Sequence, residues 1–368
     1  MKFSIIIPVY NVAPYLREHL DSLLAQNIPA GEYEIIAVND GSTDNSPAIL
    51  SEYEAAHPGR FTIIDQPNGG LGVARNTGFA AARGDYVWMA DSDDVILPNC
   101  LAAIHKTLVE TGAEVLHFPY KGFTKLSEIK TGWRTITELD ATPVLTRAAL
   151  CAFTPCTWDK IFSREFLLRA GFHIPSLWMH EDVADIYRVL SLTRRENGIF
   201  HTNRTLYYYR RRPGSMTDSQ VYSERRMEGY VTAIRMLADQ MRASGDLRNE
   251  YEWCMFNQAE DLVIQFENLL ESGKCDDESR DAIAKHLPTL IQLMKLPDPG
   301  NPLLQSLRLW KLETEAWYKY EIGAWVAHAS KETRRHYENS LSWRVTAPLR
   351  FMADLFRGVD KRRPDMLE

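Results

Sequence analysis

The sequence predicts an α/β domain with a mainly parallel sheet flanked by helices, followed by an α-helical C-terminal region. Over the first 120 residues, short apolar runs of strand length alternate with segments of helical character, the pattern of strand–helix–strand crossover units. After Ser219, apolar residues recur at spacings of three and four, as on one face of a helix. A chain of 368 residues is long enough for two domains, or for one large domain with an appendage.

The elements of the first region follow in order. Strands are expected at the apolar runs 3–7, 34–38, 61–64, 86–90 and 115–118, with helices between them at 15–26 and 71–83. Ser46 stands before Pro47 and predicts a helix capped by Ser46. Later segments predict helices at 146–153 and 164–170 and an aromatic strand at 206–209, whereas 121–137 shows no clear periodicity.

The C-terminal region opens with an amphipathic pattern formed by Met227, Val231, Ile234, Leu237 and Met241. We therefore expect an α/β domain over 1–218, a helical domain over 219–340 and an amphipathic basic tail over 341–368. His286 is isolated in the sequence, and we expect a surface or hydrogen-bonded histidine there rather than a metal ligand.

The tail 341–368 combines an apolar helical face with six basic residues against four acids. Basic side chains beside an apolar face are typical of helices that bind anionic membrane surfaces. The alternative is a helix docked on the protein's own core or on a partner subunit.

Composition limits the class of protein. The 42 Lys and Arg residues against 49 Asp and Glu give a net charge of −7, which argues against a nucleic-acid partner held by net positive charge. No apolar stretch approaches the ~18–20 residues of a membrane-spanning helix. Five scattered cysteines with no CxxC pair fit a reducing compartment. We expect a cytoplasmic protein, with the inner face of the cell membrane as its location if the tail binds lipid.

Polar or glycine-rich turns follow four successive predicted strands. They are Pro8-Val9-Tyr10-Asn11, Asn39-Asp40-Gly41-Ser42, Asn68-Gly69-Gly70-Leu71-Gly72 and Asp91-Ser92-Asp93-Asp94. Because ligands of open parallel sheets bind at the carboxyl ends of the strands, these turns predict one composite site.

The last turn places three carboxylates within four residues, at Asp91, Asp93 and Asp94. Crowded carboxylates raise one another's pKa values, and a divalent cation relieves that repulsion. Hard oxygen ligands suit Mg²⁺ or Mn²⁺. The alternative is a solvated acidic turn in which Asp94 caps the next helix.

Three further groups could meet an anionic ligand or do acid–base chemistry. Arg75 lies in the first turns of the helix predicted over 71–83, near the ligand side, and could bind a phosphate, or form a surface ion pair. Glu181 and Asp182 open a predicted helix, where acids can simply complement the helix dipole. The loop after Tyr208 carries three successive arginines and suits a diphosphate, or is an ordinary basic surface loop.

The ordered set SIIIPVYN, VNDGSTDNS, NGGLGVARNTG, DSDD, WDKIF, HED and YYYRRRPGSMT resembles the family 2 glycosyltransferases. The resemblance covers about residues 3–218 and is specific as a set, although each motif alone is not. It implies the GT-A fold, a Rossmann-like sheet flanked by helices, and an inverting enzyme that uses a nucleotide-sugar donor.

The resemblance also implies roles for individual residues. Pro8 and Tyr10 would pack beside the nucleobase, Asp40 would read the base edge, and Asn68 and Arg75 would continue the nucleoside pocket. Asp91 and Asp93 would form the DxD motif that meets the ribose and holds Mn²⁺ or Mg²⁺. Asp182 would be the catalytic base with Glu181 beside it, and Arg210, Arg212 and Ser215 would close over the diphosphate. Lys160 would be a donor ligand or a structural lysine.

The sequence thus favours a metal-dependent inverting glycosyltransferase that moves a sugar, from UDP in the family pattern, to a hydroxyl of a glycan or lipid-linked acceptor. A carboxylate base and an electrostatically stabilised leaving diphosphate are what that reaction needs. One alternative is a sugar-1-phosphate nucleotidylyltransferase, whose glycine-rich signature after the first strand is absent. Another is a noncatalytic nucleotide-binding scaffold of the same fold.

Overall fold

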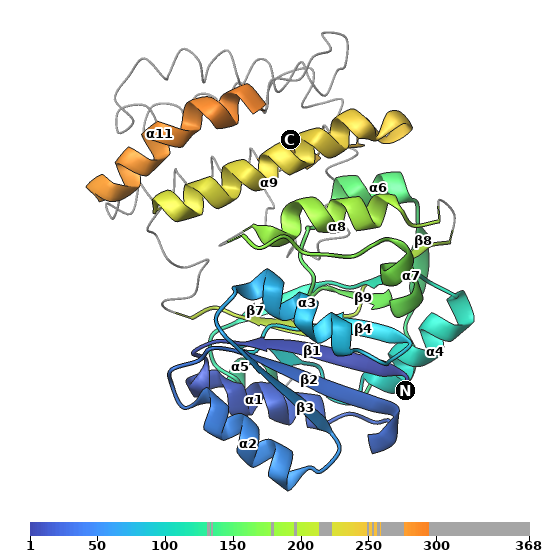
Figure 1. Ribbon diagram of the computed structural model, residues 1–368. Coiled ribbons are helices and arrows are strands. Elements are labelled where there is room, and N and C mark those ends of the chain that lie inside the picture. The colour runs from blue at the N-terminus through green and yellow to red at the C-terminus, as the bar shows by residue number, and fades with distance from the viewer. Residues whose placement is uncertain are drawn as a thin grey trace, which may run out of the picture. The chain divides into compact units, whose positions relative to one another are not determined.

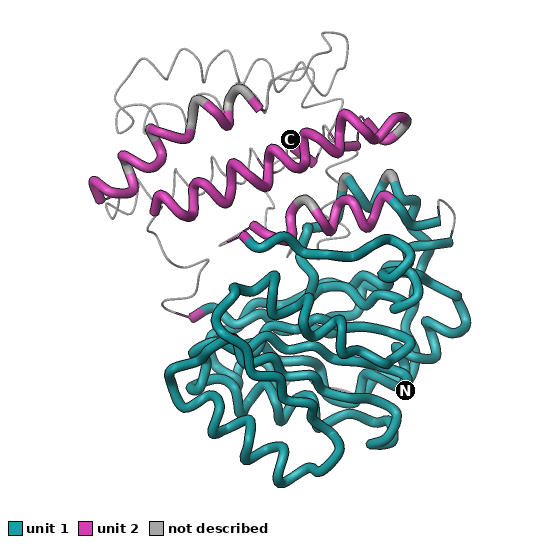
Figure 2. Tube along the Cα trace, viewed as in Figure 1, with its two compact units in different colours: residues 1–176, 192–211, 351–368 teal, residues 177–191, 212–350 magenta. Residues whose placement is uncertain are grey.

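The computed structural model (Figure 1) describes residues 1–130, 133, 135–177, 180–194, 197–212, 223–248, 250, 251, 254, 255, 258 and 276–293. These residues fall into two compact units (Figure 2). The first contains Met1–Ser176 and Leu192–Arg211, and the second contains Leu177–Ser191 and the described residues from Arg212 onward. The predicted tail 341–368 lies outside the described residues.

The first unit is built on an eight-stranded sheet with the strand order β3-β2-β1-β4-β9-β6-β10-β8. Its strands are β1 (Phe3–Val9), β2 (Tyr33–Asp40), β3 (Phe61–Gln66), β4 (Tyr86–Met89), β6 (Val115–His117), β8 (Ala141–Val144), β9 (Lys160–Ser163) and β10 (Ile199–Thr202). β1 pairs in parallel with β2 and β4, β2 with β3, and β6 with β10, whereas β9 and β8 run antiparallel to their neighbours. The predicted α/β fold with a mainly parallel sheet is therefore confirmed.

Helices cover both faces of this sheet, as the apolar strands require (Figure 1). They are α1 (Ala13–Leu24), α2 (Ser46–Ala56), α3 (Leu71–Ala81), α4 (Leu101–Thr111), α5 (Ser127–Lys130), α6 (Thr146–Ala152) and α7 (Arg164–Arg169). Ile5 and Ile7 share one core with Leu16 and Leu20 of α1. On the other face α3 lies so close that a Cβ atom on Gly78 would be 2.3 Å from Ile6 Cγ2.

A second sheet of three strands, β5 (Val95–Ile96), β11 (Tyr207–Arg210) and β7 (Tyr120–Phe123), adjoins the acidic turn. β11 pairs in parallel with β7 and antiparallel with β5. β7 and α5 occupy part of the stretch 121–137, where the sequence shows no periodicity. Because these two elements have four residues each, they are too short to leave a periodic signal.

One predicted cap is wrong in its position. The helix α2 begins at Ser46 itself, with Asn45 at the N-cap. The Ser46 hydroxyl instead accepts a hydrogen bond from the Val12 N–H at 3.1 Å. The serine therefore links the start of α2 to the loop after β1.

The second unit is helical in its described part, with α8 (Glu181–Ser191), α9 (Glu224–Ala243) and α11 (Asp277–Leu293). The five apolar residues that predict an amphipathic helix are all buried on α9. Ser223 caps α9 by accepting a hydrogen bond from the Arg226 N–H. Within the described residues, every helix is too short or too polar to cross a lipid bilayer.

Candidate active site

The four predicted turns meet at one edge of the sheet. Because β3, β2, β1 and β4 are neighbours and run in parallel, their carboxyl ends lie side by side. Val9 is the partner of Asn39, and Asp40 is the partner of Gln66. We call this the carboxyl edge.

The loops after β1 and β2 are bonded into one structure. The Asn11 side-chain oxygen accepts hydrogen bonds from the N–H groups of Thr43 and Asp44, at 2.8 and 3.2 Å. Asp44 in turn accepts from the Ala13 N–H at 2.9 Å, at the start of α1. Asn11 has a φ of +50°, a left-handed conformation that asparagine tolerates better than most residues. The polar residues Asn11 and Asp44 thus hold the loops after β1 and β2 in place at the border of the site.

Asp40 holds the glycine-rich turn. Its buried carboxylate accepts from Gln66 Nε2 at 2.7 Å and from the N–H groups of Gly69 and Gly70 at 2.8 and 2.9 Å. Next to it, Gly41 has a φ of +73°, and a Cβ atom there would lie 2.9 Å from the Asn68 nitrogen. Asp40 and Gly41 therefore fix where Asn68 stands, in addition to any contact that Asp40 makes with a base.

Tyr10 and Pro8 lie at the end of β1. The Tyr10 side chain is 48% exposed, so its ring can stack on a planar ligand. Pro8 is paired with Val38 within the sheet, and its rigid backbone leads directly to Tyr10.

Arg75 makes an ion pair with Asp91 rather than a surface contact. Its Nη2 lies 2.7 Å from Asp91 Oδ1, and the arginine side chain is 2% exposed against 23% for the aspartate. Arg75 reaches Asp91 from α3, beneath the carboxyl edge. One of the two predicted metal ligands is therefore oriented by a buried cation.

Asp94 is the most buried of the three clustered acids. It accepts from the Tyr207 hydroxyl at 2.7 Å and from the Arg210 N–H at 2.6 Å. The same hydroxyl accepts from the Asp91 N–H at 3.0 Å. Asp94 therefore anchors β11 to the acidic turn rather than capping the following helix.

Burial dominates the electrostatics of this cluster. It raises the pKa of Asp91, with a further rise from Asp93 and an opposing effect of Arg75. It raises the pKa of Asp94 well above its usual value, and the charges of Asp93 and Asp91 add to the rise. A divalent cation beside Asp91 and Asp93 would relieve this repulsion. The residues present therefore fit the predicted Mn²⁺ or Mg²⁺.

Arg210 closes one side of the cluster. Its Nε donates to the Asp93 carbonyl at 2.6 Å, and its Nη2 donates to Glu18 Oε2 at 2.5 Å. Its guanidinium carbon lies 4.4 Å from the centre of the Phe123 ring. Arg212 is half-buried, and Ser215 lies outside the described residues.

Lys160 is fully buried, and its ammonium is held by the protein. Nζ donates to Asp159 Oδ1 at 2.6 Å and to the carbonyls of Thr154 and Cys156 at 2.7 and 3.0 Å. Burial pushes the pKa of Asp159 upward, but Lys160 and His117 outweigh it and hold that pKa below its usual value. This arrangement favours the structural alternative for Lys160 over the donor-ligand one.

Glu181 and Asp182 form the first turn of α8, in the second compact unit. Glu181 is buried and Asp182 is half-buried. The preceding residue, His180, has a φ of +62° and stands edge-on to Tyr230 at 4.5 Å between ring centres. Burial lowers the pKa of His180 to about 3, so this histidine is neutral at the helix start.

Sequence reasoning missed three residues around the acidic turn, namely Tyr207, Glu18 and His19. The Nδ1 of His19 bonds to the Asp94 carbonyl at 2.9 Å, and burial lowers its pKa to about 4. A period of two in the run from Tyr207 to Arg210 places Tyr207 and Tyr209 on one face. The hydroxyl contact itself has no sequence signal.

His286 is not isolated in the structure. Its Nε2 lies 2.6 Å from Glu224 Oε1, and the ligand atoms of Glu224, Glu228 and His286 lie within 4.8 Å of one another. Lys285 also pairs with Glu224, and an ammonium there opposes a bound cation.

The strand order and the acidic edge define the GT-A class of fold. Residues 4–163, less than half of the chain, match the model of glycosyl transferase family 2, and the chain is similar to that family over this stretch.

Curated relatives and a solved structure are also similar to this chain. The chain is 34% identical over 226 residues to the uncharacterized glycosyltransferase EpsJ of Bacillus subtilis, covering 58% of this chain and 62% of EpsJ. It is 32% identical over 248 residues to glycosyltransferase GlyA of Streptococcus pneumoniae, covering 63% of this chain and 34% of GlyA. The chain thus spans less than two thirds of either relative. S. aureus TarS 1–349 in complex with UDP-GlcNAc has the same fold, with a TM-score of 0.67 and 23% identity over 90% of this chain and 92% of that one.

Proposed function

We propose that this chain is a metal-dependent inverting glycosyltransferase that moves a sugar from a nucleotide-sugar donor to a hydroxyl of a glycan or lipid-linked acceptor. The observation that carries the proposal is the carboxyl edge, where Asp91 and Asp93 stand at the end of the central strand β4. The ion pair of Asp91 with buried Arg75, at 2.7 Å, holds one carboxylate in place for a cation and a diphosphate.

The nucleoside would lie across the ends of β1, β2 and β3. Tyr10 offers an exposed ring to the base, with Pro8 behind it. Asp40 and Asn68 supply the polar groups around the base and ribose. UDP is the proposed nucleotide, in line with the UDP-GlcNAc complex of TarS.

Asp93 and Asp91 would hold Mn²⁺ or Mg²⁺, which supplies electrostatic stabilisation to the departing diphosphate when bound. Arg210 donates a hydrogen bond to the Asp93 carbonyl and so helps to hold the acidic turn in position. The family resemblance supports a role for Arg210, Arg212 and Ser215 toward the diphosphate. Lys160 contributes by fixing the backbone of the segment before β9.

Asp182 is the proposed general base, with Glu181 beside it. An ionised carboxylate takes the proton of the acceptor hydroxyl as that oxygen attacks the anomeric carbon, and the configuration inverts. Asp182→Asn keeps the size of the side chain but removes the base. We expect turnover to fall by about 100- to 10,000-fold, while calorimetry shows nucleotide affinity within about twofold of the parent. Transfer at the parent rate would show that another residue is the base.

Calorimetric titration of the full chain with UDP, GDP, CDP and dTDP, each with and without Mn²⁺, tests the donor assignment. We expect tight binding of UDP that requires the metal. Equal binding with and without Mn²⁺ would contradict the metal site. Binding of none of the four would contradict the proposed function.

The tail 341–368 is proposed to bind an anionic membrane surface, which would place a cytoplasmic enzyme beside a lipid-linked acceptor. Its six basic residues and apolar face carry this proposal. Sedimentation with phosphatidylglycerol liposomes at low salt should recover the full chain. Equal recovery after deletion of 341–368 would rule out the tail as the anchor.

A further inference from the structure

An aromatic cluster extends from the acidic turn to the protein surface. Tyr207 and Tyr209 are two residues apart on β11 and therefore point to the same side. The ring of Trp158 stacks on both, with ring centres 5.0 and 5.5 Å apart and planes at 17° and 26°. Tyr120 of β7 stands edge-on to Trp158 at 4.7 Å and 86°. We call these four residues the aromatic cluster.

Exposure increases along the cluster away from the acidic turn. Tyr207 and Trp158 are buried, Tyr209 is half-buried, and Tyr120 is 43% exposed. The Trp158 carbonyl also accepts a hydrogen bond from Trp88 Nε1 at 2.8 Å, which fixes its backbone. The outermost ring is therefore held in one orientation by buried neighbours, so little ordering would be needed when a ligand packs on it.

The cluster is continuous with the proposed donor site. The Tyr207 hydroxyl accepts from the Asp91 N–H at 3.0 Å and donates to Asp94 at 2.7 Å. The inner end of the cluster thus touches the turn that carries the proposed metal ligands.

Strand order places the cluster on the side away from the nucleoside residues. From β4 towards β1, β2 and β3 the strand ends carry Tyr10, Asp40 and Asn68. In the other direction Trp158 precedes the antiparallel strand β9, and Tyr120 follows β6. A donor bound over the first three strands would present its anomeric carbon at Asp91 and Asp93, so the cluster lies where an attacking hydroxyl would approach.

A polar group accompanies the exposed ring. Arg211 continues the alternation of Tyr207 and Tyr209, so it extends to the same side. A Cβ atom on Gly122 of β7 would lie 3.0 Å from Arg211 Nε, so the missing side chain leaves room for the guanidinium along β7. An apolar platform with a nearby fork of N–H donors suits a sugar, whose C–H face packs on a ring while its hydroxyls accept hydrogen bonds.

We propose that Tyr120, supported by Trp158 and Tyr209 and assisted by Arg211, is the subsite that binds a pyranose ring of the acceptor. This inference rests on the proposed function and adds to it the chemical class of the acceptor and the residue that recognises it. Because Tyr120 and Tyr10 are exposed to a similar degree, 43% and 48%, they form a matched pair, one on each side of the acidic turn.

Saturation-transfer NMR on the full chain with UDP and Mn²⁺ present tests the inference. The probes are methyl β-D-glucopyranoside and methyl β-N-acetyl-D-glucosaminide. We expect saturation transfer to the ring protons of at least one glycoside in the parent. Tyr120→Ala should weaken glycoside affinity by about fivefold to tenfold, the loss expected for one aromatic contact, and leave UDP affinity within about twofold. Tyr120→Phe keeps the ring and should behave as the parent.

Tyr10→Ala is the matched control, and it should weaken UDP binding without changing glycoside affinity. Lack of transfer to both glycosides in the parent, or unchanged glycoside affinity in Tyr120→Ala, overturns the inference. An equal loss in Tyr120→Phe and Tyr120→Ala also overturns it, because the ring would then not be the contact. UDP binding in the same samples is a separate readout, so failure of the proposed function would be seen independently.

Discussion

The two edges of the large sheet use the same residue types in opposite ways. At the carboxyl edge three acids share one turn, and burial raises the pKa values of Asp91 and Asp94. At the opposite edge, which we call the amino edge, buried acids lie at the starts of parallel strands. There each acid accepts hydrogen bonds from arginine side chains and from backbone N–H groups.

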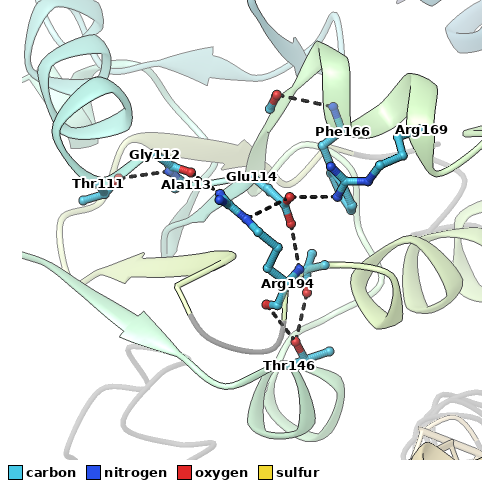
Figure 3. A network of polar contacts seen from close by, with 10 residues as sticks. Thr111, Gly112, Ala113, Glu114, Thr146, Phe166, Arg169 and Arg194 are labelled. Atoms are coloured by element: carbon cyan, nitrogen blue, oxygen red, sulfur yellow. Dashed lines mark hydrogen bonds and ion pairs between the residues drawn. The ribbon is translucent and has the colours of Figure 1, made fainter.

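Glu34 and Glu114 illustrate the amino edge. Burial pushes the pKa of Glu34 upward, but hydrogen bonds from Arg83 and Ser4 outweigh it and hold that pKa below its usual value. Glu114 accepts from Arg169 Nη2 at 2.7 Å and from the Arg194 N–H at 2.8 Å (Figure 3).

The cavity at the amino edge has a volume of about 470 Å³. Its lining includes Glu114, Arg169 and Arg194. Both negatively and positively charged side chains therefore line this cavity.

The comparison distinguishes the acids at the amino edge, which stabilise the fold, from the acids at the carboxyl edge, which are proposed to bind a ligand. Paired acids at the amino edge lower the free energy of the folded chain on their own. Crowded acids at the carboxyl edge raise it until a cation binds. Substitutions at the two edges should therefore affect different measurements.

Among the substitutions at the two edges, Asp93→Ala should produce the largest effect. Removing one charged partner of a close ion contact costs about 2–5 kcal/mol, so UDP affinity in the presence of Mn²⁺ should fall by roughly 100-fold. Because like charges repel in this turn, the thermal midpoint without metal should be unchanged or higher. Calorimetry and thermal unfolding measure the two effects.

Asp85→Ala is the matched control, since Asp85 is an exposed aspartate just before the same strand, β4. It should leave UDP affinity unchanged. An equal loss of affinity in both variants would mean that net charge, rather than the carboxyl edge, attracts the nucleotide.

Glu114→Ala should have the reverse effect, a loss of stability without loss of binding. The partly buried hydrogen bond from the Arg194 N–H to the Glu114 carboxylate would be lost, and a hydrogen bond to a charged group contributes about 1.5–3 kcal/mol. Urea unfolding of the parent and variant measures the difference. Weaker UDP binding with unchanged stability in Glu114→Ala would contradict the proposed difference between the two edges.

Glu34→Gln should have the smallest effect, and the effect should depend on pH. The folded pKa of Glu34 lies below its unfolded pKa. The carboxylate therefore stabilises the fold above the unfolded pKa and loses this effect as the pH falls through the folded pKa. The difference in unfolding free energy between parent and variant should be largest near neutral pH and should shrink as the solution is acidified. A difference in unfolding free energy that grows on acidification would contradict this prediction.

The sequence predicts the first half of the fold well because buried parallel strands are nearly continuous apolar runs. The antiparallel strand β9 was not predicted, since its four residues include a buried lysine, Lys160. β8 was missed because ATPV is short and contains a proline.

Side-chain partners were less predictable than elements. Arg75 was expected to bind a phosphate or to form a surface ion pair, but it forms a buried ion pair with Asp91. The two residues lie 16 positions apart, and their contact depends on how α3 packs on the sheet. Tyr207 joins the acidic turn across 116 positions of sequence, a distance over which no local pattern operates.

The most direct test of the account is the position of Mn²⁺ in crystals of the chain grown with UDP, read from anomalous scattering at the manganese edge. The account predicts a peak beside the carboxylates of Asp91 and Asp93. A peak only at Glu224, Glu228 and His286, or none at the carboxyl edge with UDP bound, would contradict it.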